Sequence, residues 1–333
     1  SEYGEGAPDP GKAHYPYTSN MVSTMNYKRL LLNCLGMVLF TATVSGPTAA
    51  AEDSAQQNPP NILLLVGDDI SFGDLGISGG VTQTPVLDRL ANEGVMFTRF
   101  HASPVCSVSR GMLLTGNDPI DFGLAAFDYA LYPPAAGKPG YESYLTRATT
   151  ATIAELLRDA GNRTYMTGKW HLGGAHGGEG PQDWGFDRSY SIYTGGAYLW
   201  NSGVFHVDTH NPEVMAQVKA GKIPQEPYFE DGKRVERPQG IYSDDLWTGK
   251  LLQYLEQERE SGKPFFAYVA YTTAHAPLQA PDFLIDKYVD HYLKLGYAGL
   301  KQARFDAQKR LGLIPPDAVF PDTTKNQLLR SWE

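Results

Sequence analysis

The chain has few cysteines and no excess of positive charge. Only two of its 333 residues are cysteine, and 28 Lys and Arg stand against 37 Asp and Glu, for a net charge of -9. Because nucleic acids and anionic membranes both require a basic face, this balance argues against either as a general partner. Hydrophobic residues make up 42% of the sequence and charged residues 20%, which is enough to bury a full globular core.

The main apolar run is too short and too interrupted for a membrane span. It covers Leu30–Val44, follows the positive charges of Met25–Arg29, and precedes the small residues Thr48–Ala50. That order is typical of a secretory signal peptide, although an uncleaved anchor would share it. We expect residues 1–57 to be a disordered preface and signal peptide. Residues 58–333 would then be an exported domain, periplasmic or extracellular, with no stable membrane insertion after cleavage.

Signal cleavage would leave a single cysteine. Cys34 lies inside the apolar run, so a processed chain would keep only Cys106 and could form no internal disulfide. A lone cysteine in an exported protein is either an inert packed residue or a reactive site. The residues around Cys106 therefore decide its role.

Strands and helices alternate along the rest of the chain. The apolar run 61–66 suits a parallel strand buried on both faces. Further strands are expected at 95–100, 163–166 and 265–271, and helices at 85–93, 107–115, 153–160, 246–258 and 282–313. Such alternation predicts an α/β fold with a mainly parallel central sheet flanked by helices on both faces.

Two long segments, 118–149 and 173–240, show weak periodicity and are rich in Gly, Pro and aromatic residues. Connections of this length in a compact domain are usually functional loops, and these could wall a substrate cleft. Some aromatic side chains of the second segment could stack on an aryl or sugar group, or could equally serve as core. They are Tyr190, Tyr193, Tyr198 and Trp200.

Adjacent carboxylates, Asp68 and Asp69, follow the first predicted strand. Open α/β sheets place their sites at the carboxyl ends of the strands. A carboxylate pair at such a point suits a hard divalent cation that takes several oxygens, although an isolated Asp-Asp is also common in turns and helix caps. The pair is therefore a candidate metal site.

Cys106 precedes a segment that can begin a helix, so backbone N–H groups and the positive end of the helix dipole would face it. Arg110, one turn further on, could hold the nucleophile or an oxyanion. The same features describe an activated thiolate. A thiol protein with His171 or His275 as its base is therefore an open alternative.

The run Cys106–Gly116 resembles the sulfatase family signature, in which the cysteine is oxidised to formylglycine. Other stretches resemble that family in the same order along the chain, from about Pro60 to the end, and look most like bacterial arylsulfatases. They are Asp68–Gly76, Gly137–Glu142, Thr167–Gly173, Ala274–Leu278 and Leu329–Glu333.

The resemblance implies an alkaline-phosphatase-like fold and a site for one calcium ion. The implied metal ligands are Asp68, Asp69 and the modified Cys106. It also implies a formylglycine-generating maturation enzyme as a partner, and a small sulfate ester or a sulfated glycan as substrate. The phosphodiesterases and phosphonate monoester hydrolases of the same superfamily share the cysteine signature and remain an alternative activity.

The catalytic roles implied by the resemblance fall on cationic residues and histidines. Lys169 neutralises the sulfuryl oxygens, and His275 protonates the leaving alcohol or phenol. His171, helped by Arg110, assists proton loss from the formylglycine diol so that sulfate is expelled.

The sequence departs from the family pattern at two points. Val108 stands where the signature has proline or alanine, and its β-branched side chain predicts reduced or absent conversion of Cys106. No Asp-Asn pair follows His275, which leaves a cation short of its six to eight oxygens. We therefore expect the C-terminal part of the fold to be missing, with weak calcium affinity and little hydrolysis. A non-catalytic binder of sulfated ligands is a further alternative.

Overall fold

The computed structural model describes residues 59–126, 137–147, 150–174, 179–197, 199–200 and 226–320, with positions 213, 216, 217, 220 and 322. The chain divides into two compact units, Ser1–Gln57 and Asn58–Glu333. The predicted signal peptide, Tyr198 and Leu329–Glu333 lie outside the described residues. Among the helices that are described, none is long and apolar enough to cross a membrane.

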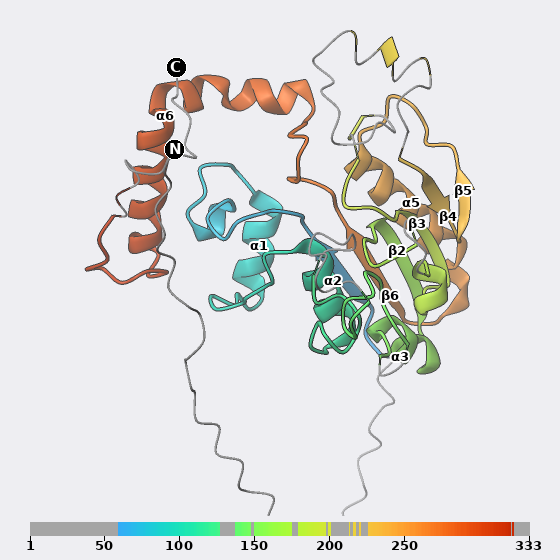
Figure 1. The fold of residues 1–333 in the computed structure, drawn as a ribbon. Helices are drawn as coiled ribbons and strands as arrows, with labels where there is room; N and C mark the ends of the chain where they lie inside the picture. The colour runs from blue at the N-terminus through green and yellow to red at the C-terminus, as the bar shows by residue number, and fades with distance from the viewer. Residues whose placement is uncertain are drawn as a thin grey trace, which may run out of the picture. The chain divides into compact units, whose positions relative to one another are not determined.

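One six-stranded sheet organises the second unit (Figure 1), in the order β1-β6-β2-β3-β4-β5. The strands are β1 Ile62–Val66, β2 Arg163–Lys169, β3 Arg188–Ile192, β4 Tyr228–Glu230, β5 Lys233–Val235 and β6 Phe265–Ala270. The first four in spatial order pair in parallel, and β4 and β5 pair antiparallel. The predicted mainly parallel sheet is confirmed.

Helices cover both faces of this sheet. The α-helices are α1 Pro85–Glu93, α2 Cys106–Thr115, α3 Ile153–Asp159, α5 Ser243–Gln257 and α6 Asp282–Arg310. The 3₁₀ helices are η2 Gly76–Ser78, η4 Pro181–Trp184 and η5 Arg259–Ser261. The predicted helices at these places are confirmed, and the helical N-terminus at Cys106 is among them.

The central strand β6 explains why two helical layers are needed. Its side chains alternate, so Phe266, Tyr268 and Ala270 join a core cluster on one face, which also contains Leu114 of α2 and Ala154 of α3. Ala267 and Val269 join a second cluster on the other face, where α5 contributes Leu246, Trp247, Leu251 and Tyr254. A strand that is apolar on both faces must be covered twice.

The first strand differs from its prediction. β1 lies at the edge of the sheet with β6 as its neighbour, and 54% of Leu63 and 44% of Leu65 remain exposed. The expectation that residues 61–66 are buried on both faces is wrong, because the described helices do not cover this end of the sheet. The strand predicted at 95–100 is also absent, and that segment is irregular and largely exposed.

The segment 173–240 contains three strands that the sequence did not indicate. β3 extends the parallel sheet, and β4 and β5 form a short hairpin whose turn places Asp231 and Gly232 at positive φ. Tyr190 of β3 is fully buried among core aromatics, and Tyr193 stacks on Phe229 with ring centroids 4.1 Å apart. The core interpretation of these two tyrosines is therefore confirmed.

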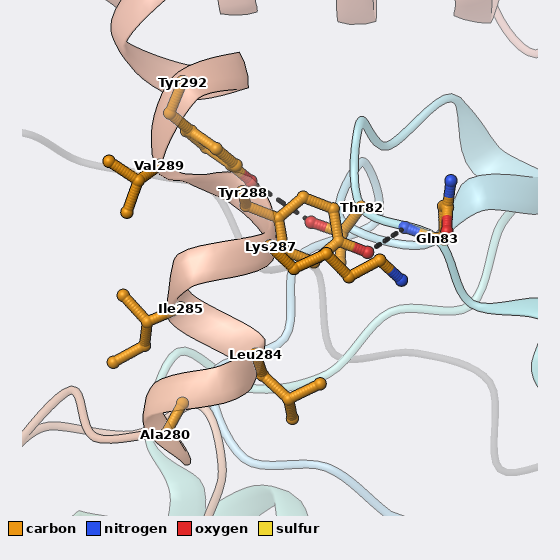
Figure 2. Close-up of a pocket in the computed structure, with 9 residues that line it drawn as sticks. All are labelled: Thr82, Gln83, Ala280, Leu284, Ile285, Lys287, Tyr288, Val289 and Tyr292. Atoms are coloured by element: carbon orange, nitrogen blue, oxygen red, sulfur yellow. Dashed lines mark hydrogen bonds between the residues drawn. The ribbon is translucent and has the colours of Figure 1, made fainter.

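α6 consists of two arms that meet at Gly296, whose backbone is non-helical (Figure 1). The first arm lines an apolar pocket opposite Thr82 and Gln83 (Figure 2). Tyr288 accepts a 3.0 Å hydrogen bond from the Gln83 amide, and the Tyr292 hydroxyl lies 3.1 Å from that of Thr82.

Candidate active site

The candidate residues gather where parallel strands end. Asp68 comes two residues after β1, Lys169 is the last residue of β2, and His171 follows two residues later. The loop after β6 carries His275, and α2 begins at Cys106. Because β1, β6 and β2 are adjacent and parallel, their carboxyl ends meet at one edge of the sheet.

Asp68 is the centre of a buried ionic cluster. Lys169 Nζ lies 2.6 Å from Asp68 Oδ2, and a terminal guanidinium nitrogen of Arg110 lies 3.2 Å from Asp68 Oδ1. All three side chains are almost completely buried. Burial by itself would raise the pKa of the Asp68 carboxyl, but the charges of Lys169 and Arg110 outweigh it and lower that pKa. The carboxylate is therefore ionised, and each of its oxygens faces a cation.

Arg110 is held by more than Asp68. It donates to the backbone carbonyl of Lys169 at 2.9 Å and to the Tyr268 hydroxyl at 3.1 Å. Burial raises the pKa of Tyr268, so this phenol is neutral at physiological pH. The sequence did not single out Tyr268, since within an apolar strand it reads as core. The contacts of Arg110 orient the cluster around Asp68.

Cys106 and His171 form the second part of the site. Cys106 Sγ lies 3.3 Å from His171 Nδ1. The thiol is at the first residue of α2, and Val105 before it supplies no side-chain cap. Burial raises the pKa of Cys106, but the hydrogen bond with His171 and the charges of Lys169 and His171 prevail and lower it to about 7. A large fraction of an unmodified thiol is therefore thiolate at neutral pH.

The ring of His171 is confined by its surroundings. Its backbone has a φ of 54°, and a Cβ placed on Gly195 would come within 3.0 Å of its Cε1. Gly168, three residues earlier, has a φ of 105° and leaves no room for a Cβ beside the carbonyl of Ala270. Two glycines thus permit the close approach of backbone to this part of the site.

Asp69 and His275 lie at the more open side of the site. Asp69 has a φ of 60°, and 62% of its side chain is exposed. His275 Nε2 lies 3.8 Å from Asp69 Oδ2, whereas its Nδ1 lies 2.7 Å from the carbonyl oxygen of Ala276. Since a carbonyl can only accept, Nδ1 carries a proton that it donates to Ala276.

The donors that surround Asp68 do not by themselves fit a complete metal site. Within the part of the chain that the structure describes, no three His, Cys, Asp or Glu side chains form a group that could hold a metal ion. Both oxygens of Asp68 face Lys169 or Arg110, and Asp69 points largely to solvent. The calcium site predicted from Asp68, Asp69 and Cys106 therefore stays a prediction.

Glu226 is a buried carboxyl group that the sequence did not indicate. Only 5% of its surface is exposed, just before β4. Burial raises its pKa to about 7, while hydrogen bonds with Thr194 and the charge of His171 act in the opposite direction. Nothing in the sequence distinguishes this Glu from a surface one, because its burial depends on how β4 pairs with β3.

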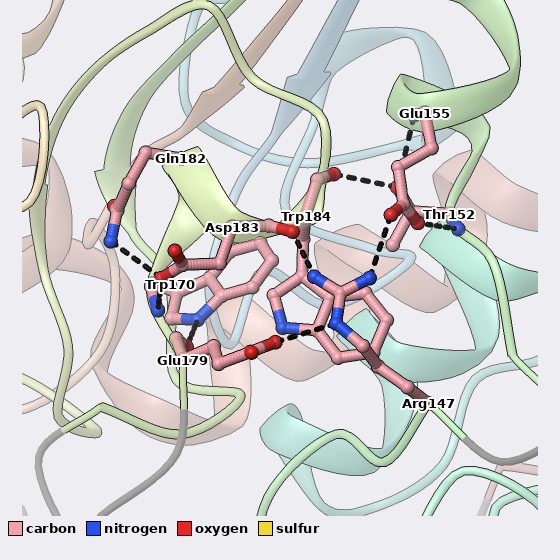
Figure 3. A network of polar contacts seen from close by, with 9 residues as sticks. Arg147, Thr152, Glu155, Trp170, Glu179, Gln182, Asp183 and Trp184 are labelled. Atoms are coloured by element: carbon pink, nitrogen blue, oxygen red, sulfur yellow. Dashed lines mark hydrogen bonds and ion pairs between the residues drawn. The ribbon is translucent and has the colours of Figure 1, made fainter.

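A polar network supports the turn that carries His171 (Figure 3). Arg147 binds Glu155 of α3 at 2.9 Å and Glu179 at 2.8 Å, and its guanidinium lies 4.1 Å above the ring of Trp184. The backbone carbonyl of Glu179 accepts a 3.1 Å hydrogen bond from the indole of Trp170. Trp170, the residue before His171, is thereby linked through Glu179 and Arg147 to α3 and to η4.

A mainly parallel sheet with a cysteine–histidine contact and a buried ionic cluster at its carboxyl edge is an arrangement typical of sites in the α/β class of proteins. The Sulfatase family model matches residues 60–299. The chain is 33% identical over 292 residues to an arylsulfatase of Klebsiella aerogenes, covering 88% of this chain and 58% of that protein. The chain belongs to the sulfatase family.

Other relatives agree with this assignment. An uncharacterized sulfatase of Schizosaccharomyces pombe is 35% identical over 288 residues, covering 85% of this chain and 50% of that protein. The crystal structure of Ps i-CgsB is 28% identical with a TM-score of 0.55, and the match covers 76% of this chain and 56% of that one. The chain thus spans about half the length of the relatives it matches.

Proposed function

We propose that this protein hydrolyses sulfate esters with residue 106 as its nucleophile. The observation that carries the proposal is the 3.3 Å contact between Cys106 and His171 at the N-terminus of α2, beside Lys169. A helix N-terminus and a buried ammonium favour a bound anion such as a sulfuryl group. Membership of the sulfatase family supports the same reaction.

Sulfatases generally use formylglycine and a divalent cation, and we propose that Cys106 is converted to formylglycine by a maturation enzyme. When hydrated, that group supplies a hydroxyl that attacks sulfur as the bond to the ester oxygen breaks. His171 Nδ1 is within reach of residue 106 and can take a proton there. Lys169 offsets negative charge on the sulfuryl oxygens.

His275 is the proposed acid for the leaving group. Its Nδ1 proton is donated to the carbonyl oxygen of Ala276, so the proton that is transferred to the leaving group must be carried on Nε2. Nε2 lies 3.8 Å from Asp69 Oδ2, at the more open side of the site. His275 can therefore protonate the departing alcohol or phenol oxygen.

The proposed cation is calcium, with Asp68 and Asp69 among its ligands. These two carboxylates have four oxygens between them, fewer than the six to eight that calcium takes, and both oxygens of Asp68 already face Lys169 or Arg110. The oxidised residue 106 is the third proposed ligand, and water or backbone carbonyls would supply the remaining oxygens. Weak binding of calcium to the chain as it stands is the corresponding expectation.

The proposed substrates are aryl or sugar sulfate esters, met outside the cytoplasm after export. Relatives support a carbohydrate or aryl substrate. One is the N-acetylgalactosamine-6-sulfatase of the dog, 33% identical over 241 residues. A structure of Ps i-CgsB in complex with k-i-k-neocarrahexaose, 25% identical with a TM-score of 0.50, is another.

The test compares 4-nitrophenyl sulfate with 4-nitrophenyl phosphate and bis(4-nitrophenyl) phosphate. We expect the purified full chain to hydrolyse the sulfate in proportion to the fraction of residue 106 that mass spectrometry finds converted, and Cys106→Ala to be inactive. Faster cleavage of the phosphate esters would favour the phosphodiesterase alternative. Undiminished sulfate hydrolysis by Cys106→Ala would overturn the proposed nucleophile.

A non-catalytic binder of sulfated ligands is the second candidate. Each oxygen of Asp68 is paired with a cation, Lys169 or Arg110, so the three side chains together carry a net positive charge. A cluster of this charge could bind a sulfate group without a metal ion. Calorimetric binding of a sulfated oligosaccharide to a chain that keeps the free thiol and hydrolyses nothing would support it.

A further inference from the structure

The loop that carries His275 is clamped to Asp68 through its backbone. The Asp68 amide donates to the carbonyl of Thr273 at 2.9 Å, and the Ala274 amide donates to the carbonyl of Asp68 at 2.6 Å. The His275 amide in turn donates to the carbonyl of Thr272 at 3.0 Å. The position of His275 is thus coupled to that of Asp68 by a continuous set of hydrogen bonds.

The same loop is held from the opposite side by the start of α5. The Thr273 hydroxyl donates to the carboxylate of Asp244 in the first turn of α5. The Tyr242 hydroxyl lies 3.1 Å from that of Thr273 and donates to the carbonyl of Gln279 at 3.0 Å. Residues on both sides of His275 are therefore anchored to one helix end.

A third contact fixes where this helix end lies. Thr248, one turn into α5, donates its hydroxyl to the carbonyl of Asp244 and lies 3.0 Å from the Tyr271 hydroxyl at the start of the loop. α5 itself is packed on the sheet through Trp247 and Leu251. The start of α5 is therefore fixed by the core of the fold, and its contacts in turn fix the position of the His275 loop.

We propose that Asp244 is a positioning residue, which holds the His275 loop against Asp68 by accepting the hydrogen bond from Thr273. The inference rests on the proposed function in one respect, since it takes His275 to be the leaving-group acid. Asp244 itself touches no reacting atom. Its effect is transmitted through Thr273 and the backbone clamp.

A simpler role for Asp244 is to complement the dipole of α5. Acidic residues in the first turn of a helix stabilise it by roughly 0.3–1 kcal/mol. Asp245 occupies the same turn and is exposed, and no hydrogen bond to the His275 loop is found for it among the described contacts. Asp245→Asn is therefore a matched control, because it removes the same charge from the same helix end.

The first measurement is amide hydrogen exchange in the full chain, which requires no activity. Asp244→Asn should raise exchange at Ala274 and His275 by roughly 10- to 100-fold, because hydrogen bonds to charged groups contribute more than neutral ones. Asp245→Asn should leave both amides unchanged. Equal effects of the two variants, or none from Asp244→Asn, would overturn the proposal.

A second pair of variants covers the case in which Asp244→Asn does not fold. Thr273→Val keeps the shape of the side chain but removes the hydroxyl, and should reproduce the faster exchange. Thr273→Ser keeps the hydroxyl and should not. If Thr273→Val and Thr273→Ser behave alike, Thr273 does not transmit the effect and the proposal fails.

The final experiment compares kcat/KM for aryl sulfates with good and poor leaving groups. A displaced acid matters most when the leaving oxygen is basic, so Asp244→Asn should lower the rate on phenyl sulfate more than on 4-nitrophenyl sulfate. Equal losses on the two esters would mean a merely structural role. If the unmutated chain hydrolyses neither ester, the proposed function fails, and the exchange result still decides whether Asp244 positions the loop.

Discussion

Lys169 Nζ lies 2.6 Å from Oδ2 of Asp68, and Arg110 faces the other oxygen of the same carboxylate. Replacing Asp68 by Asn would leave two buried cations without a counter-charge. Breaking a buried ion pair in this way costs about 3–5 kcal/mol. We expect Asp68→Asn to lose a comparable part of the free energy of unfolding, measured by urea denaturation. Asp69→Asn is the control, since its exposed side chain predicts a change within about 0.5 kcal/mol.

The thiol of unconverted Cys106 should be unusually reactive. Its pKa is lowered to about 7, so the rate of alkylation by iodoacetamide should rise through pH 7 and level off near pH 8, about one unit above that pKa. A chain carrying Cys34→Ser isolates this thiol. Adding His171→Asn, which tolerates the positive φ, should move the midpoint to higher pH because the hydrogen bond and the charge of His171 are lost. An unchanged midpoint in that variant would rule out His171 as the cause.

Glu226 should make the protein less stable as pH rises. Its folded pKa of about 7 lies above the ordinary value of 4.5, so the folded state binds more protons between these values. The free energy of unfolding should therefore fall between about pH 4.5 and pH 7, by up to about 3 kcal/mol, and stay constant above. Glu226→Gln removes this loss.

The measurement for Glu226 is the difference in unfolding free energy between Glu226→Gln and the unmutated chain at several pH values. The two should be equally stable near pH 4, and the variant should be more stable at pH 8. Exposed Glu236 provides the matched substitution, Glu236→Gln, which makes the same chemical change at a side chain that is not buried. A flat difference for Glu226→Gln would contradict the buried, protonated state.

Two glycine substitutions should have opposite signs. Gly168→Ala forces a side chain against the carbonyl of Ala270 at a φ of 105°, and should cost about 3 kcal/mol or more. Gly249 lies inside α5 with open space around it, so Gly249→Ala should stabilise the protein by about 0.5–1 kcal/mol. Thermal unfolding of the two variants checks both signs.

Val108→Ala should increase the conversion of Cys106 when the chain is expressed with a formylglycine-generating enzyme. The smaller side chain matches the family pattern at this position. Because Val108 is only 5% exposed, the same change should destabilise the folded protein by about 2 kcal/mol. Mass spectrometry of the peptide that contains Cys106 gives the converted fraction. Complete conversion of the unmutated chain would contradict the expected effect of Val108.

The sequence predicted those elements whose pattern is local. The apolar run of β6 and the stripe of α5 are long enough to be recognised without their partners, and the start of β2 was predicted at 163–166. β3 was missed because Ser189 and Ser191 resemble a polar surface segment, although both are fully buried. Their burial comes from pairing with β2, which lies in another part of the sequence.

The site shows the same division between local and long-range information. Asp68 and His171 follow parallel strands and Lys169 ends one, so their approach could be predicted from topology. The contact of Arg110 with Tyr268, and the roles of Asp244 and Glu226, depend on helix rotation and strand register. No sequence motif specifies the rotation of a helix or the register of a strand, and a single sequence contains no other signal for them.

Because α6 bends at Gly296, its two arms contact the segment 74–83, which follows Asp69, at two separate places. Its first arm reaches Thr82 and Gln83, and its second arm carries Arg304, which binds Asp74 at 3.0 Å. A straight helix could not make both sets of contacts. The bend at Gly296 therefore holds the segment 74–83 at both of its ends, and straightening the helix would break the contacts of one arm.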